Sequence, residues 1–147
     1  MLISEDHKVP LATVQIWDRV GSRDEVSGKS GLSHFLEHVM FKGIPKYGPK
    51  AFSKIIQKNG DVDNAMTTKD YTMCFEILSS DRIGISIDLE ADRMSSLLVD
   101  PQETSAERDV VMEERRMRQE DDPENSLFER FIATSLMAHP YRRPVIG

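Results

Sequence analysis

The chain has 147 residues, of which 30% are charged and 39% hydrophobic, and its formal net charge is −6. This composition is typical of one globular domain with its own core, and the excess of acidic groups argues against general nucleic-acid binding. The sequence contains no apolar run long enough for a membrane span. The single cysteine, Cys74, excludes an intrachain disulfide and leaves a cytoplasmic and a periplasmic location both open. We expect it to be a small residue of the core.

Three segments show the alternation and the β-branched enrichment of strands, at residues 9–20, 61–68 and 71–78. A tight turn at Lys69 and Asp70 joins the last two. Five helices are predicted from capping residues and apolar spacing, at residues 30–42, from near Pro49 to Asn59 and Gly60, and at residues 80–99, 101–121 and 124–138. This order of elements predicts an α+β fold, in which helices pack on one side of a mostly antiparallel sheet.

The segment at residues 80–99 is the least regular of the five predicted helices. Apolar residues alternate with others over residues 83–89, as they do in a strand. The length of the segment favours a helix instead, and so does the helical spacing of four apolar residues, Ile87, Ala91, Met94 and Leu98.

The first predicted helix carries an H-x-x-E-H sequence, formed by His34, Glu37 and His38. Residues four apart lie on one face of a helix, so both imidazoles can reach a single metal ion, and Glu37 overlooks the same ion. This arrangement is the inverse of the common zinc signature H-E-x-x-H. With the histidine and glutamate content of this chain, such a triple arises by chance at roughly one per cent.

A pair of histidines can also lie on a solvated helix face or serve as hydrogen-bonded core residues. The helical wheel argues against a plain solvated face, because it places Phe41 beside the histidines and an apolar stripe on the opposite side. The stripe consists of Leu32, Phe35, Leu36, Val39 and Met40. Both sides of the helix are therefore expected to be covered, and the metal site is favoured over the two alternatives.

A third metal ligand is predicted on the acidic helix at residues 101–121. A helical wheel places Glu107 and Glu114 in one stripe with three apolar residues, Val110, Val111 and Met117. Carboxylates embedded in an apolar stripe are costly to bury without a cation or hydrogen bonds. A zinc ion would offset this cost for Glu114. The wheel leaves open the alternative that both glutamates extend to water.

These features resemble the zinc peptidases of the pitrilysin/insulinase family, M16. The resemblance lies in the H-x-x-E-H sequence, in Glu114 further along the chain, and in three other segments. The segments are residues 19–23, 60–68 and 140–147. The resemblance spans nearly the whole chain.

The resemblance implies a role for individual residues. Three residues would bind one zinc ion, and these are His34, His38 and Glu114. Glu37 would be the catalytic base. Glu107 would not bind the metal but would contact and orient the residues that do. Asn64 and Ala65 match an edge strand on which family members lay their peptide substrate.

The implied activity is zinc-dependent hydrolysis of peptide bonds in extended or unfolded peptides, with water activated by zinc and Glu37. Two alternatives remain. A non-catalytic subunit of the family would bind peptides or stabilise a partner, but such subunits usually lose part of the zinc motif, which is complete here. A purely structural zinc normally has four protein ligands rich in cysteine, and Cys74 is the only cysteine of the chain.

Family members enclose their substrate between two or four homologous domains. Residues 1–147 are therefore expected to be part of the first such domain, incomplete at both ends. A C-terminal half or a homologous partner domain would supply the enclosure and an arginine–tyrosine pair that assists the substrate carbonyl. We expect the isolated chain to have little or no peptidase activity. Its exposed apolar surface would dock the rest of the domain or a second copy of the chain, as a homo-oligomer.

Overall fold

The computed structural model describes residues 1–43, 51–58 and 62–147 of the chain. Within these ranges one sheet has three antiparallel strands in the order β1-β3-β2, and these are β1 (Leu11–Asp18), β2 (Val62–Thr67) and β3 (Thr72–Ser79). Strand β3 is central, so β2 forms one edge of this sheet. The three predicted strands are confirmed, with small shifts at their ends. The turn predicted at Lys69 and Asp70 is confirmed as well, because the Thr68 N–H donates to the Tyr71 carbonyl at 2.8 Å.

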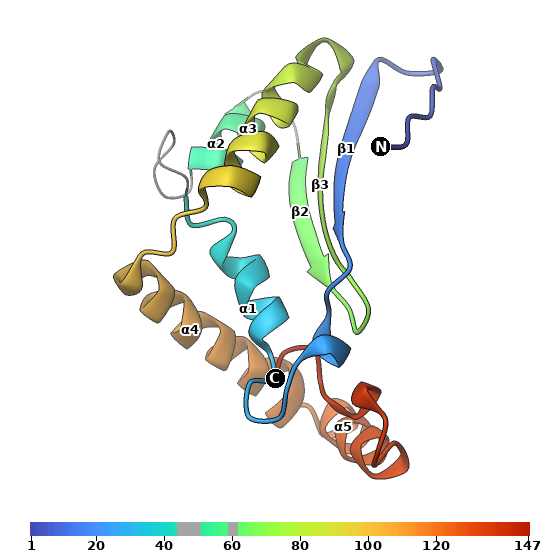
Figure 1. Cartoon of the computed structure of the whole chain (residues 1–147), viewed down its shortest axis with the longest axis vertical. Helices are drawn as coiled ribbons and strands as arrows, with labels where there is room; N and C mark the ends of the chain where they lie inside the picture. The colour runs from blue at the N-terminus through green and yellow to red at the C-terminus, as the bar shows by residue number, and fades with distance from the viewer. Residues whose placement is uncertain (44–50, 59–61) are drawn as a thin grey trace.

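The α-helices of the described ranges are α1 (Leu32–Val39), α2 (Ala51–Lys58), α3 (Ile83–Ser96), α4 (Pro101–Arg115) and α5 (Pro123–Ser135). Figure 1 shows α1, α2 and α3 on one side of the sheet, with α4 beside α1 and α5 beyond the end of the strands. The predicted α+β fold is therefore confirmed. The start predicted near Pro49 and the end predicted at Asn59 and Gly60 lie outside the described residues.

Helices α4 and α5 both begin at an Asp-Pro pair. The side chains of Asp100 and Asp122 each accept hydrogen bonds from two backbone N–H groups of the first turn, and the proline that follows needs no such partner. Between the two helices, Arg116–Glu120 forms a π-helical turn, in which the Asp121 N–H donates to the Arg116 carbonyl at 2.8 Å. This wider turn changes the direction in which the residues after α4 point.

The face of α3 that packs on the sheet is mostly polar. Its buried residues are Ser86, Leu89, Glu90 and Arg93, whereas the four apolar residues that predicted the helix are exposed. The buried Glu76 of β3 accepts a hydrogen bond from Ser86 Oγ at 2.9 Å and shares a hydrogen bond with Glu90. Arg93 Nε donates to Glu90 at 3.1 Å. The inner face can be polar because these groups satisfy one another.

The apolar stripe predicted for α1 is wrong at two positions. Leu32 and Leu36 are exposed, whereas Val39 is buried as expected. Helix α1 lies between the sheet and α4, so its burial follows the two lines of contact with these elements, which include Ser33 and Glu37. A helical wheel gives the spacing of residues within a helix but not the sides that neighbouring elements cover.

The stripe predicted for α4 is too wide. Glu107 and Val111 are buried, but Val110 and Met117 are exposed. Helix α4 packs against α1, and Glu107 and Val111 are buried on this helix, whereas Val110 is half-exposed. Met117 belongs to the π-helical turn, where the 3.6-residue period of the preceding helix no longer holds.

Large apolar side chains are exposed on the sheet face away from the helices and on α5. Trp17 of β1 lies on that sheet face, and α5 exposes Leu127, Phe128 and Phe131. This agrees with the expectation of an exposed apolar surface. Cys74 is buried in β3, as predicted. In the part of the chain that the structure describes, no helix has the length and apolarity needed to cross a membrane.

Candidate metal centre

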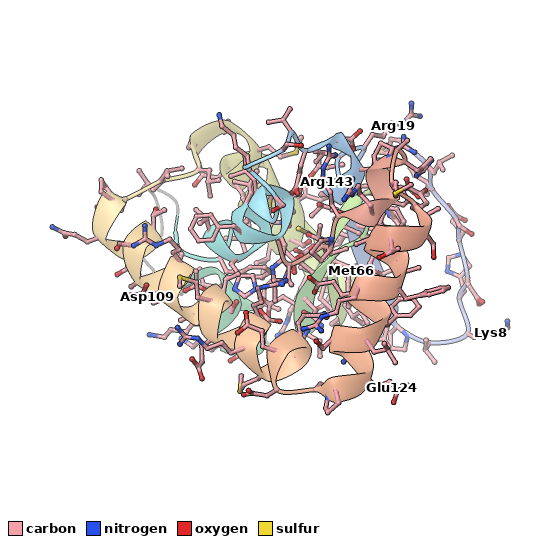
Figure 2. The ribbon with its side chains drawn as sticks, turned by 90° about the horizontal axis from the view of Figure 1, so that it is seen from below. Lys8, Arg19, Met66, Asp109, Glu124 and Arg143 are labelled. Atoms are coloured by element: carbon pink, nitrogen blue, oxygen red, sulfur yellow. The ribbon has the colours of Figure 1, made fainter. Side chains whose placement is uncertain are left out.

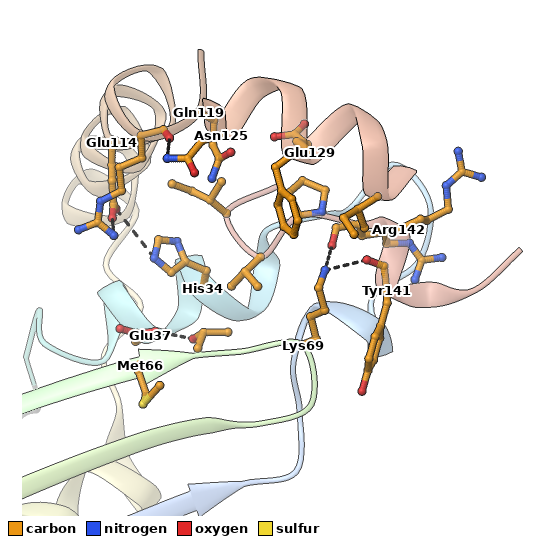
Figure 3. A pocket seen from close by; sticks show the side chains of 18 of the residues that line it. His34, Glu37, Met66, Lys69, Glu114, Gln119, Asn125, Glu129, Tyr141 and Arg142 are labelled. Atoms are coloured by element: carbon orange, nitrogen blue, oxygen red, sulfur yellow. Dashed lines mark hydrogen bonds and ion pairs between the residues drawn. The ribbon is translucent and has the colours of Figure 1, made fainter. Parts of the chain in front are cut away.

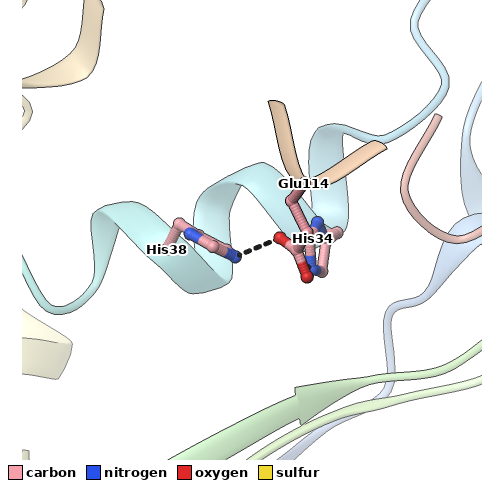
Figure 4. A group of neighbouring side chains, drawn as sticks. All are labelled: His34, His38 and Glu114. Atoms are coloured by element: carbon pink, nitrogen blue, oxygen red, sulfur yellow. Dashed lines mark ion pairs between the residues drawn. The ribbon is translucent and has the colours of Figure 1, made fainter. Parts of the chain in front are cut away.

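Helices α1 and α4 bring three potential metal ligands together. His34 and His38 lie one turn apart on α1, and Glu114 approaches them from α4 (Figure 4). The Glu114 Oε2 atom lies 3.4 Å from His38 Nε2 and 3.9 Å from His34 Nε2. One possible ligand atom of each residue lies within 4.8 Å of the other two. The three side chains predicted to bind zinc thus meet at one point.

The environment of this point fits a metal ion. The side chains of His34 and Glu114 are only 12% and 15% exposed. Among the described residues, Glu114 Oε2 and His34 Nδ1 are buried atoms without a hydrogen-bond partner. A buried carboxylate oxygen without a hydrogen-bond donor is costly, and a cation between it and the imidazoles would remove that cost. Two imidazoles and one carboxylate form a ligand set of catalytic zinc sites, which leave one position open.

The protonation of His34 also suits metal binding. Burial and the neighbouring His38 lower the pKa of His34 below its ordinary value. The two rings lie with their centroids 4.7 Å apart. A lowered pKa keeps the imidazole neutral at about pH 7, and only the neutral form can bind a metal.

Glu107 of α4 contacts the second ring nitrogen of His38. The distance between His38 Nδ1 and Glu107 Oε1 is 2.9 Å, and Glu107 also forms an ion pair with Lys42. Burial acts to raise the pKa of Glu107, but hydrogen bonds from Lys42 and His38 outweigh it and lower the pKa, so the group is a carboxylate. Glu107 therefore contacts His38, the candidate ligand that it was predicted to orient.

Glu37 lies on α1 between the two histidines and is buried. The hydroxyl of Thr67, on β2, donates a hydrogen bond to Glu37 Oε2. Both residues line the cavity that contains the three potential ligands (Figure 3). The carboxylate is thus held in place next to the candidate metal centre, as a proton acceptor must be.

This cavity has a volume of about 750 Å³ and is lined by α1, β2, α4, α5 and the C-terminal segment. Met66 of β2 lines this cavity, and Figure 2 shows it between α4 and α5. Asn64 and Ala65 of β2 line the same cavity, and the Ala65 N–H donates to Asn64 Oδ1 at 2.9 Å. The edge strand predicted to receive the substrate therefore borders the candidate centre.

Another wall of the cavity comes from α5 and the segment after it. The apolar side chains of Phe128, Ile132 and Leu136 belong to this wall. Lys69 Nζ donates to the Tyr141 and Arg143 carbonyls at 2.7 and 2.8 Å, which ties the C-terminal segment to the β2–β3 turn (Figure 3).

Three residues that were not predicted contact the predicted ones, and these are Lys42, Thr67 and Arg118. Arg118 Nη1 lies 2.9 Å from Glu114 Oε1. A signal existed for Lys42 and Arg118, because each follows a candidate ligand by four residues, a spacing that keeps two residues on one face. Thr67 belongs to another element, and no local pattern connects β2 with α1.

Similarity to known proteins identifies the family of this chain. The family model described as Insulinase (Peptidase family M16) matches residues 1–147. The chain belongs to the M16 peptidase family. The zinc protease PqqE of Helicobacter pylori is 39% identical over 142 residues, which are 97% of this chain and 32% of that protein. The crystal structure of a protease from Helicobacter pylori matches with a TM-score of 0.92 and 40% identity, covering 95% of this chain and 34% of that chain.

Membership of the M16 family confirms the resemblance found in the sequence. The family also includes relatives whose names do not mention a protease. Cytochrome b-c1 complex subunit 1, mitochondrial, of Rattus norvegicus is 32% identical over 146 residues, which are 98% of this chain and 30% of that protein. This chain spans about a third of the length of the curated relatives that it matches.

Proposed function

We propose that this chain carries the zinc centre of an endopeptidase that hydrolyses extended or unfolded peptides. The proposal rests on the meeting of His34, His38 and Glu114, with the buried Glu37 in the same cavity. Membership of M16 and the zinc-protease names of relatives support it. A structural zinc site would need further protein ligands, normally cysteines. Among the described residues, the potential ligand group has only these three members.

Each residue of the centre has a separate task. A zinc ion held by His34, His38 and Glu114 would lower the pKa of water to about 7 and polarise the substrate carbonyl. Glu37 accepts a proton from the attacking water and returns it to the leaving amine. Thr67 holds one oxygen of Glu37 during these steps.

The peptide substrate is proposed to add to the edge of the sheet at Asn64 and Ala65 of β2. An edge strand presents backbone groups that another strand can pair with. A peptide added in this way is held through its main chain, whatever most of its side chains are. This mode selects extended peptides, because a folded segment already uses its backbone groups internally.

A further part of the protein or a homologous partner domain is proposed to complete the enclosure of the substrate. The matched relatives are much longer than this chain, which covers 32% of the first of them. We therefore expect residues 1–147 alone to cleave peptides poorly even when zinc is bound.

A second candidate function is a non-catalytic subunit that binds peptides or stabilises a partner. The similarity to cytochrome b-c1 complex subunit 1 favours it, because that name describes a subunit of a complex. A subunit without catalysis would not need the three potential ligands and the buried Glu37 next to one another. The peptidase is therefore preferred.

The experiment is cleavage of an unstructured fluorogenic peptide by the full-length protein. We expect a chelator to abolish cleavage and added zinc to restore it. Glu37→Gln should retain zinc but lower the turnover number by about 10²–10⁴-fold, since it removes the proton acceptor. Cleavage that survives both chelation and Glu37→Gln would overturn the proposal. Zinc binding without cleavage of any peptide in a diverse library would favour the second candidate.

A further inference from the structure

Two successive contacts join Lys42 to the candidate metal centre. The Lys42 ammonium forms an ion pair with Glu107 Oε2, and Glu107 Oε1 lies 2.9 Å from His38 Nδ1. We propose that Lys42 is a positioning residue for the zinc ligand His38 and acts through Glu107. This inference depends on the zinc centre of the proposed function.

The end of α1 directs Lys42 towards α4. The helix ends at Val39, but the Lys42 N–H still donates to the Val39 carbonyl at 2.9 Å and the Phe41 N–H to the His38 carbonyl at 3.3 Å. The chain therefore continues to turn, and Lys42 stays close to the face that carries His38. Its side chain is only 17% exposed, so the ammonium lies against α4 rather than in water.

Glu107 needs a cation in this position. Its side chain is 9% exposed, and a buried carboxylate without a counter-charge is costly. Lys42 pairs with one carboxylate oxygen, while the other oxygen contacts His38. Because each oxygen has its own partner, the plane of the carboxylate is defined. Without Lys42, one carboxylate oxygen loses its counter-charge and the plane of the carboxylate is no longer fixed.

The fixed orientation of the Glu107 carboxylate in turn determines which ring nitrogen of His38 carries the proton. A carboxylate acceptor at Nδ1 keeps the imidazole proton on that nitrogen. The lone pair then lies on Nε2, which is 3.4 Å from Glu114 Oε2. A metal at the candidate centre requires this tautomer and this ring orientation. Lys42 therefore prepares His38 for metal binding although it is not itself a ligand.

An ion pair between α1 and α4 could also contribute to the stability of the fold alone. The two roles differ in how the effects of substitutions combine. If Lys42 acts through Glu107, its loss has no further effect on zinc binding once Glu107 has been changed. If Lys42 only stabilises the fold, the two losses add and the His38 tautomer does not depend on Lys42.

The experiment measures zinc affinity of the full-length protein by competition with a chromophoric chelator. Glu107→Gln and Lys42→Met are each expected to weaken zinc binding by about 10–100-fold, the usual effect of changing a group behind a metal ligand. Lys42→Arg should restore most of the affinity. The double variant Lys42→Met/Glu107→Gln should bind zinc no more weakly than Glu107→Gln. If Lys42→Met alone folds poorly, the double variant still allows the test, because it contains no buried carboxylate without a counter-charge.

Nitrogen NMR of the metal-free protein gives a second measurement, the tautomer of His38. We expect a proton on Nδ1 in the unaltered protein and in Lys42→Arg, and a mixture of tautomers in Lys42→Met. Lys54→Met is the matched control. Lys54 belongs to α2, lines the same cavity as Lys42, and is exposed. Additive losses in the double variant, or a Lys42→Met protein with unchanged affinity and tautomer, would overturn the inference. Absence of zinc binding in the unaltered protein would overturn the proposed function as well.

Discussion

Glu113 and Glu114 are adjacent in α4, yet only Glu114 is turned into the candidate metal centre. The Glu113 side chain is 58% exposed and pairs with Arg116 at 2.9 Å. The Glu114 side chain is 15% exposed and lies 3.4 Å from His38 Nε2. Neighbouring residues of a helix point about 100° apart, which accounts for the two environments.

This difference predicts opposite results for two matched substitutions. Glu114→Gln removes an anionic group from the centre and should weaken zinc binding by more than about 100-fold, beyond the effect usual for groups behind the ligands. Glu113→Gln should leave the affinity nearly unchanged. Isothermal titration of zinc into both variants measures this. The reverse order of affinities would show that the register of α4 is wrong by one residue.

Arg118 also contacts Glu114, but we expect its side chain to contribute little to zinc affinity. Its side chain is 71% exposed, although its guanidinium lies 2.9 Å from Glu114 Oε1. Because the Arg118 end of the pair is solvated, salt screens it and its contribution should stay at about the 0–1 kcal/mol of surface pairs, so Arg118→Ala should change zinc affinity by no more than about five-fold. Zinc titration at low and high salt measures the effect. A large loss that is independent of salt would mean that Arg118 has a structural role in holding Glu114.

The buried carboxyl pair of Glu76 and Glu90 predicts a pH dependence of stability. Burial, followed by the contact with Glu90, raises the pKa of Glu76 from 4.5 to about 8. The folded state therefore binds a proton that the unfolded state releases, so this contribution to stability is complete below pH 4.5 and is lost as the pH rises towards 8. The loss should amount to a few kcal/mol.

Glu76→Gln tests this because the amide stays neutral and can still accept the hydrogen bond from Ser86. The free energy of unfolding in urea, measured from about pH 5 to pH 9, should fall with pH in the unaltered protein and fall much less in the variant. Glu113→Gln, at an exposed site, is the control and should follow the unaltered protein. Parallel curves for Glu76→Gln and the unaltered protein would contradict the assignment.

Cys74 should be unreactive in the folded protein. It is 2% exposed, and burial raises its pKa to about 11. The thiolate is the nucleophilic form, so a buried protonated thiol reacts slowly at about pH 8. Labelling with iodoacetamide, followed by mass spectrometry, should be slow in buffer and complete in denaturant. Equally fast labelling under both conditions would place Cys74 at the surface.

Local patterns in the sequence determined the helices and strands of this fold and the three candidate site residues on α1. Glu37 and the two histidines lie on one helix, so their spacing alone brings them to one place. The Asp-Pro pairs at Asp100 and Asp122 start α4 and α5 through hydrogen bonds within the first turn. Strand alternation likewise predicted the three strands. In the helices the decisive interactions join residues close in the chain, whereas the strand alternation only marks the two faces of each strand, and β1 pairs with β3 across the chain.

The tertiary structure decided which faces are covered and which distant groups meet. The apolar spacing of α3 identified a helix, but the covered face holds Glu90, because Glu76 of β3 lies there to pair with it. Lys42 reaches Glu107 because α1 and α4 pack together, and Thr67 reaches Glu37 because β2 lies beside α1. Helical periodicity gives only the directions in which side chains point around the axis of one helix. Burial and pairing depend on where the neighbouring elements lie, which only the packing of the domain sets.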